Sequence, residues 1–343
     1  MGKKMFQSVV ILWVLLLAVS ISFAAAPYYE GKTIRLIVGY TAGGGFDTYS
    51  RLIGRHLGKH IPGNPTVIVD NMPGGGSMIA AKQVYSRAKP DGLTIANVTS
   101  QLILAQMLGR EGMDIDMRKF EYLGVPVADN VVCAFNKVCG ITNFKDWMGS
   151  KTPVKIGGDA PGSVPADTPK ILKAALDLPI HLVEGYKGTN EIRMAADTGE
   201  VCGGCWQWES IKVIWAKGLS TGDVNVLIQA TDKPLPDLPN VPLAVNVAKT
   251  EEGRQLIRAA ISEPGSITRL YCLAPETPKD RVQILQKAFM DTMHDKDLLE
   301  EAGKAKLAID PMPGDEVAKI VNGLFGLNPT VLAKLKEILH PKK

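Results

Sequence analysis

The sequence predicts an α/β protein made of two blocks in which parallel strands alternate with helices. Short apolar runs are followed by glycine-rich loops and then by amphipathic stretches, and this order occurs three times before residue 110 and resumes at Val154. The length of 343 residues suffices for two domains at roughly 150 residues each. The composition is ordinary, with 45% hydrophobic and 22% charged residues, and it excludes a disordered chain or a long coiled coil.

The first block is expected to contain three strands, each leading to a helix. The strands are the apolar runs at 34–38, 67–69 and 93–98, and the helices are expected at 48–57, at 77–88 and after Ser100. Asp47 can cap the first helix, because a short carboxylate accepts hydrogen bonds from the free N–H groups at a helix start. In a parallel sheet the loops that follow the strands meet at one edge, where ligands bind.

The second block repeats this order with shorter elements. Strands are expected at 154–156, 180–183 and 224–228, and helices at 169–176 and from Asn190. Four prolines between Pro234 and Pro242 predict an extended connection that crosses between the two blocks. The part that follows is expected to be mostly helical, starting with a helix after Thr277 and Pro278.

The strongest continuous hydrophobicity lies in the first 26 residues. Two lysines precede an unbroken apolar run from Val9 to Val19, and small residues follow at Ala24 and Ala26. This order is typical of a secretory signal that is cut after Ala26. An uncleaved membrane anchor is the alternative, because residues 9–26 reach the short limit for a membrane span. Loss of the two lysines lowers the net charge from +4 to +2, and so small an excess argues against a nucleic-acid partner.

Two glycine-rich loops, at 39–47 and 73–77, follow the first two expected strands. Glycine lets a ligand approach the backbone closely, and the start of the next helix supplies unpaired N–H groups, so both loops are candidate anion sites. The first loop has neither the Lys-Ser/Thr pair of a P-loop nor the G-x-G-x-x-G pattern, and nucleotide binding is therefore not predicted. The alternative is that these glycines serve only to turn the chain tightly.

The cysteines and histidines of this chain are expected to be structural. Cys202 and Cys205 form a C-x-x-C that predicts a small disulfide or two buried thiols rather than a redox centre. Cys133 and Cys139 could bridge a loop, which leaves Cys272 buried in the strand 270–273. His56 and His60 have the i, i+4 spacing of metal ligands, but a third ligand is not near them in the sequence, so neither a metal nor a cofactor is predicted.

Trp206 and Trp208 stand two positions apart, so on a strand they would share one face. Aromatic side chains beside a glycine-rich segment can form the wall of a ligand pocket. Packing in the core is the alternative for both tryptophans.

The segment 29–100 resembles the extracytoplasmic solute-binding proteins of tripartite tricarboxylate transporters, the Bug or TctC family. The resemblance rests on IRLIVGYTAGGGFDTYSRLIGRHL, VIVDNMPGGGSMIAAKQV and AKPDGLTIANVTS. Three later segments extend it in the same order, namely VEGYKGTNEIRMAADTGEV, LPDLPNVPLAVN and LAPETPKDRV. Together these segments are spread over most of the mature chain.

The resemblance implies a type II periplasmic binding protein fold, with two α/β lobes joined by two crossing segments. Residues 27–126 and 234–343 would form the first lobe, and residues 127–233 the second, after a signal peptide at 1–26. The family is not enzymatic. A monomer in the periplasm would capture a small organic carboxylate between its lobes and deliver it to the integral membrane permease subunits of the transporter.

The resemblance, together with the position of Trp206 beside a glycine-rich segment, indicates which residues contact the ligand. They are Tyr40, Ala42, Gly43, Gly44, Gly45, Asp47, Gly74, Gly75, Gly76, Ser100, Asp159, Gly162, Ser163 and Trp206. Asp159 departs from the family pattern, because it stands where a hydroxyl is expected. A carboxylate at this position would repel a carboxylate ligand unless it were protonated or met an amine or hydroxyl of the ligand.

Two other functions are compatible with the sequence. An exported enzyme on the same scaffold would use Cys202 or Cys205 as a nucleophile or redox group. A binding protein could instead signal to a membrane sensor, and the sequence does not separate this role from transport.

Overall fold

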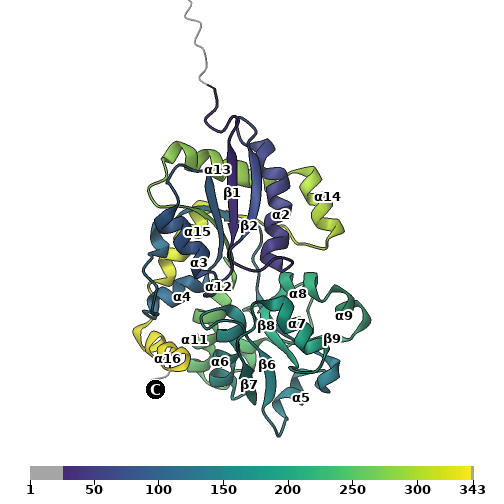
Figure 1. The fold of residues 1–343 in the computed structure, drawn as a ribbon. Helices are drawn as coiled ribbons and strands as arrows, with labels where there is room; N and C mark the ends of the chain where they lie inside the picture. Colours follow the sequence, from purple (N-terminus) through teal and green to yellow (C-terminus); the bar gives the residue numbers. More distant parts are fainter. Residues whose placement is uncertain (1–25, 341–343) are drawn as a thin grey trace, which may run out of the picture.

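The computed structural model describes residues 26–340, and these residues form two α/β lobes (Figure 1). The expected signal peptide, up to Ala25, lies outside the described residues. Within residues 26–340, the structure has no helix that is both long and apolar enough to span a membrane.

The first lobe is built around a six-stranded sheet in the order β11-β4-β10-β3-β1-β2. Strand β1 runs parallel to β2 and β3, whereas β10 is antiparallel to β3 and β4. The strands are β1 (Thr33–Val38), β2 (Thr66–Asn71), β3 (Thr94–Thr99), β4 (Glu121–Val125), β10 (Arg269–Leu273) and β11 (Met312–Pro313). The expected strand around Cys272 is therefore present, and its thiol is buried.

Helices cover both faces of this sheet, because each presents one apolar face to it. One face packs against α2 (Gly45–Leu57), α13 (Lys279–Met293) and α14 (Lys296–Lys304). The other packs against α3 (Met78–Lys82) with its continuation η2 (Gln83–Arg87), α4 (Gln101–Met107) and α15 (Gly314–Leu324).

The second lobe has a five-stranded sheet in the order β7-β6-β8-β5-β9. Its strands are β5 (Val131–Asn136), β6 (Val154–Gly157), β7 (Ile180–Val183), β8 (Gly203–Gln207) and β9 (Val224–Ala230). Its helices are α5 (Phe144–Met148), α6 (Val164–Leu176), α7 (Thr189–Asp197), α8 (Trp208–Ile214), α9 (Ala216–Thr221), α10 (Ala244–Val247), α11 (Glu251–Ile257) with its continuation η5 (Arg258–Ser262), and α16 (Pro329–Leu339). Strand β6 is parallel to β7, as the alternation of strands and helices predicts.

The chain passes between the lobes more often than expected. It crosses from β4 to β5, returns through α12 (Glu263–Gly265) to β10, and passes a third time from α15 to α16. Helix α16 packs on the second lobe, where Leu335 is fully buried in the core (Figure 1).

The expected crossing at Pro234–Pro242 is wrong. The side chain of Gln229 donates hydrogen bonds to the carbonyl oxygens of Leu238 at 2.9 Å and Val241 at 2.7 Å, and these bonds hold the segment against β9. Helices α10 and α11, which were expected in the first lobe, pack in the core of the second.

The expected disulfide between Cys202 and Cys205 is also wrong. Cys205 is bonded to Cys133 with a Cα–Cα distance of 4.0 Å, because the two residues are directly opposite in the antiparallel pair β5–β8. Cys202 lies three positions before Cys205, an odd offset that places their side chains on opposite faces of a strand. Cys202 and Cys139 are free thiols, so the suggested bridge from Cys133 to Cys139 is absent as well.

Candidate functional site

A cleft of about 290 Å³ lies between the two lobes. Its walls are four loops, and each follows one of the parallel strands β1, β2, β6 and β7. The lining residues are Gly39, Tyr40, Thr41, Pro73, Gly74, Gly75, Gly76, Ser77, Asp159, Ala160, Tyr186 and Lys187. The carboxyl ends of parallel strands from both sheets therefore converge on one site, as the chain order predicts.

In the first lobe, the loops after β1 and β2 touch each other at Gly39 and Ser77. A Cβ on Gly39 would lie 2.6 Å from the Cβ of Ser77, a distance that only glycine allows. The hydroxyl of Ser77 accepts a hydrogen bond from the backbone N–H of Thr99 at 3.2 Å. This bond joins the β2 loop to the end of β3 and fixes the wall of the cleft.

Tyr40 brings a neutral hydroxyl to the cleft. Its ring packs on Phe46 with 4.4 Å between centroids. Burial, and then the neighbouring Asp159, raise the pKa of the Tyr40 hydroxyl far above its usual value. The hydroxyl therefore stays protonated and can donate a hydrogen bond at physiological pH.

Asp159 lies in the wall contributed by the second lobe and is only 5% exposed. Its Oδ1 accepts a hydrogen bond from the hydroxyl of Ser163, which also caps helix α6. Burial raises the pKa of Asp159 to about 8, and the nearby carboxylates of Asp167 and Glu184 act in the same direction. The side chain is therefore mostly a neutral acid at pH 7.

The two lobes touch beside the cleft, at the start of helix α2. A Cβ on Gly45 would lie 2.8 Å from the Cα of Ser210 in helix α8. Gly44 and Gly45 line a small hollow of about 20 Å³ between the lobes, which the structure places next to Tyr40. A second close approach joins Gly76 to the second lobe, because a Cβ on Gly76 would lie 3.1 Å from the carbonyl oxygen of Gly162.

Asp47 supports the first loop rather than lining the cleft. Helix α2 begins at Gly45 after Gly44, so Asp47 lies inside its first turn and is not the cap. Its carboxylate accepts hydrogen bonds from the backbone N–H of Gly43 and the side chain of Asn71, each at 2.9 Å. Although burial opposes the shift, hydrogen bonds from Arg51, Gly43 and Asn71 lower the pKa of Asp47 below its usual value.

Several other residues expected at the ligand lie outside the cleft lining. Ala42 and Gly43 are exposed on the loop. Ser100 is buried at a crossing segment, where its hydroxyl donates to the carbonyl oxygen of Pro264 at 2.7 Å. Trp206 is fully buried in the second lobe and stacks on Trp215 at 5.3 Å.

Trp206 and Trp208 do not share a strand face, because β8 ends at Gln207 and Trp208 begins helix α8. Trp206 therefore packs in the core, which was the alternative to a place in the pocket wall. The indole N–H of Trp208 instead donates to Asp237 at 3.0 Å.

Thr41 and Ser77, which line the cleft, lie in the two glycine-rich loops predicted as anion sites, but sequence reasoning missed Tyr186 and Lys187. Tyr186 and Lys187 follow the correctly expected strand β7. The rule that ligands gather beyond the carboxyl ends of parallel strands could have found them.

A buried ion pair lies where the crossing segments meet. Arg269, at the start of β10, is paired with Asp129, which precedes β5, and both side chains are fully buried. The guanidinium also donates to Ser210 at 2.9 Å and lies 4.6 Å from the ring of Phe46. This pair links both crossing segments to α8, the helix that Gly45 touches.

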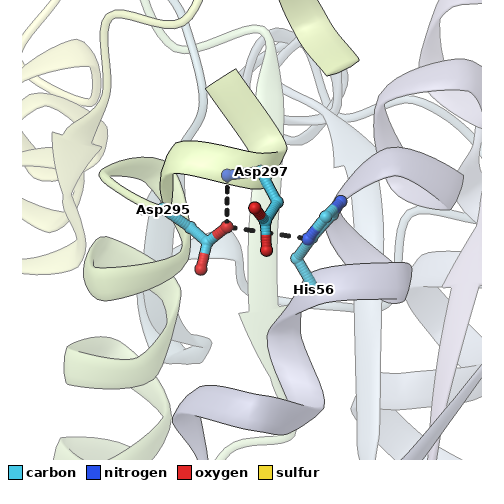
Figure 2. Close-up of side chains that lie close together, drawn as sticks. All are labelled: His56, Asp295 and Asp297. Atoms are coloured by element: carbon cyan, nitrogen blue, oxygen red, sulfur yellow. Dashed lines mark hydrogen bonds and ion pairs between the residues drawn. The ribbon is translucent and has the colours of Figure 1, made fainter. Parts of the chain in front are cut away.

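His56 faces Asp295 and Asp297 on the outer side of the first lobe (Figure 2). The ammonium of Lys59 lies 2.8 Å from Asp295 and 3.0 Å from Asp297, where it supplies the positive charge for both carboxylates. His60 also contacts Asp295, at 2.9 Å. These contacts tie α2 and the turn after it to the start of α14.

Comparison with known proteins supports both the sequence resemblance and the fold. The sequence matches no family model. It is 36% identical over 139 residues to a UPF0065 protein from Bordetella bronchiseptica, covering 40% of this chain and 41% of that protein. It is 44% identical over 75 residues to a UPF0065 protein from Cupriavidus necator, covering 22% of each chain. The chain thus spans less than half the length of either curated relative.

The solved structures agree over nearly the whole chain. The periplasmic binding protein BugD has a TM-score of 0.70 at 18% identity and covers 90% of this chain and 98% of its own. MatC from Rhodopseudomonas palustris, with bound malate, has a TM-score of 0.68 at 19% identity and covers 90% and 99%. A further R. palustris protein, with adipate, has a TM-score of 0.71 at 20% identity and covers 90% and 98%. The expected resemblance is confirmed: the chain is a sequence relative of the UPF0065 proteins and has the two-lobe fold of the periplasmic binding protein BugD and of MatC.

Proposed function

We propose that this chain is a periplasmic solute-binding protein that captures a small organic carboxylate between its lobes. The observation that carries the proposal is the cleft, which is lined by loops from both sheets. A ligand held by both lobes favours the closed arrangement of the two, and this is the basis of hinge closure.

The chemistry of the cleft suits an anion without requiring a strong positive charge. Backbone N–H groups of the glycine loop, the hydroxyls of Tyr40, Thr41 and Ser77, and the exposed Lys187 are the available donors. The volume of about 290 Å³ has room for about ten water-sized groups at roughly 30 Å³ each. This is the size of a short dicarboxylate, and the structures of MatC and of the R. palustris relative contain malate and adipate.

The rest of the proposal follows from this role. The chain would be exported with its signal cut after Ala26, would act as a monomer, and would hand its ligand to permease subunits in the membrane. It would carry out no catalysis. The alternative of an exported enzyme loses its nucleophiles, because Cys205 is in a disulfide and Cys202 is buried, and neither lines the cleft.

The proposal is tested by adding carboxylates to the mature protein (residues 27–343) and measuring its melting temperature and its binding heat. Malate, adipate, citrate and benzoate represent the di-, tri- and aromatic acids. A true ligand at a hundred times its Kd adds about 2.7 kcal/mol to the free energy of unfolding, which raises the melting temperature by several degrees. Amides of the same acids serve as controls and should have no effect. A protein that no carboxylate stabilises would contradict the proposal.

A further inference from the structure

Asp159 is the only carboxyl among the described residues that line the cleft. It stands in the loop after β6, at the edge where the ligand is proposed to bind. Its side chain is nearly buried, so water does not screen its charge. An ionised Asp159 would therefore repel a carboxylate ligand directly.

The groups around Asp159 do not neutralise it. From helix α6, Ser163 donates its hydroxyl and Asp167 adds a second buried acid. From the loop after β7, Glu184 adds a further negative charge, although it is paired with Lys170 at 2.8 Å. Tyr40 approaches from the first lobe as a neutral hydroxyl.

The basic side chains of this region do not pair with Asp159. Lys187 lines the same cleft but is exposed to solvent. Arg110 comes from the first lobe and lies against Gly162 and Asp167. In the described part of the chain, Asp159 has no salt bridge to a lysine or arginine, and its charge is left without a counterion.

We propose that Asp159 acts as a neutral carboxylic acid that donates a hydrogen bond to the carboxylate of the bound ligand. The Ser163 hydroxyl donates to Oδ1, and no other side chain of the described residues hydrogen-bonds to the carboxyl, so Oδ2 can carry the proton. Ligand capture is then coupled to one proton on the protein. This inference rests on the proposed function, and it makes Asp159 a residue that selects ligands by charge.

The coupling fixes the direction of the pH dependence. Burial raises the pKa of Asp159 to about 8, so the acid is already protonated at pH 7. A ligand that accepts its proton raises this pKa further. Affinity is full well below pH 8, is about halved at pH 8, and falls by up to tenfold for each pH unit above it, because the site must first take up a proton.

The test is calorimetric titration of the mature protein with malate and adipate between pH 6 and 9.5. Both ligands are fully ionised over most of this range, so a change in affinity reports on the protein. For the wild type we expect a constant Kd up to about pH 7.5 and a steep rise beyond pH 8. Titrations at pH 8 in buffers of different ionisation enthalpy should show uptake of about half a proton per ligand.

Two variants distinguish the effect of Asp159 on the pH dependence of binding from that of Asp167. In Asp159→Asn the amide still donates a hydrogen bond but does not titrate, so the Kd should stay within a few-fold of the wild type at pH 7 and become independent of pH. Asp167→Asn removes the adjacent buried acid, which does not line the cleft. It should keep the fall in affinity but move it to a somewhat lower pH, because Asp167 helps to raise the pKa of Asp159. Melting curves of both variants establish that they are folded.

Each other outcome counts against the inference. A wild type that binds malate or adipate equally at pH 7 and pH 9.5 overturns it, and so does the same fall in affinity in Asp159→Asn. A strong preference for an amino acid that Asp159→Asn abolishes would show that Asp159 is ionised and pairs with an ammonium group. If no carboxylate binds even at pH 6, the proposed function itself fails, and the inference fails with it.

Discussion

The thiols of Cys139 and Cys272 occupy contrasting environments. Cys139 is half-buried, and a hydrogen bond with Cys202 lowers the pKa of its thiol to about 7. Cys272 is fully buried in β10, and burial raises the pKa of its thiol well above the usual value. Since the thiolate is the reactive form, Cys139 should be the reactive thiol of the native protein.

We therefore predict that a maleimide at pH 7.5 labels Cys139 in native protein, whereas Cys272 reacts only after unfolding. Cys133 and Cys205 should react only after reduction, because they are joined in a disulfide. Peptide mapping by mass spectrometry checks all of these positions. Labelling of Cys272 before Cys139 would be inconsistent with the burial described here.

The charge state of Asp159 depends on its surroundings in the folded protein. The sequence marks it as a departure from the family pattern and leaves its charge state open. Its neutral form depends on burial and on two acids, Asp167 and Glu184, that belong to no recognisable sequence motif. The position of Trp206 beside glycines in the sequence indicated a pocket wall. In the folded protein it is buried against Trp215 and belongs to the core.

Helices α2 and α8 approach each other closely where the two lobes meet. Gly45 begins α2, and a methyl group there would meet the Cα of Ser210 at 2.8 Å. We predict that Gly45→Ala forces the lobes apart and weakens ligand binding roughly ten- to a hundredfold, which corresponds to the usual 1–3 kcal/mol of overpacking.

The matched control is Gly303→Ala in helix α14, where a new Cβ meets nothing within 4 Å. This change should leave the Kd unchanged and stabilise the helix by about 0.5–1 kcal/mol. Calorimetric titration with malate or adipate measures both variants. Equal affinities for Gly45→Ala and the wild type would show that this contact does not form when the ligand is bound.

The elements that the sequence predicted well are the strands that lead into glycine loops. Runs such as 34–38 and 180–183 are locally apolar and end at clear breaks, so their type and approximate bounds follow from local chemistry. The order of the strands in the sheets does not follow from local chemistry. The pairing of Cys133 with Cys205 depends on the register of β5 against β8 across 72 residues, and the C-x-x-C spacing carries no information about it.

Helix α16 attaches the C-terminal part of the described chain to the second lobe. It lies against α6 and α11, and Leu335 is fully buried there. We predict that Leu335→Ala lowers the free energy of unfolding by about 2–5 kcal/mol, through lost burial and the cavity that remains.

The control for this prediction is Glu337→Ala on the exposed face of the same helix. Glu337 forms only a surface ion pair with Lys334, so its loss should change stability by less than about 1 kcal/mol. Urea unfolding of both variants provides the measurement. A Leu335→Ala protein as stable as the wild type would show that α16 does not complete the second core.

The third passage of the chain also sets an order of events during synthesis. The sheet of the first lobe lacks β10, which lies between β3 and β4, until residues near 273 have been made. The core of the second lobe lacks α16 until residues near 339 have been made. Each lobe therefore needs elements from late in the chain, and neither can be complete until most of the chain has been made.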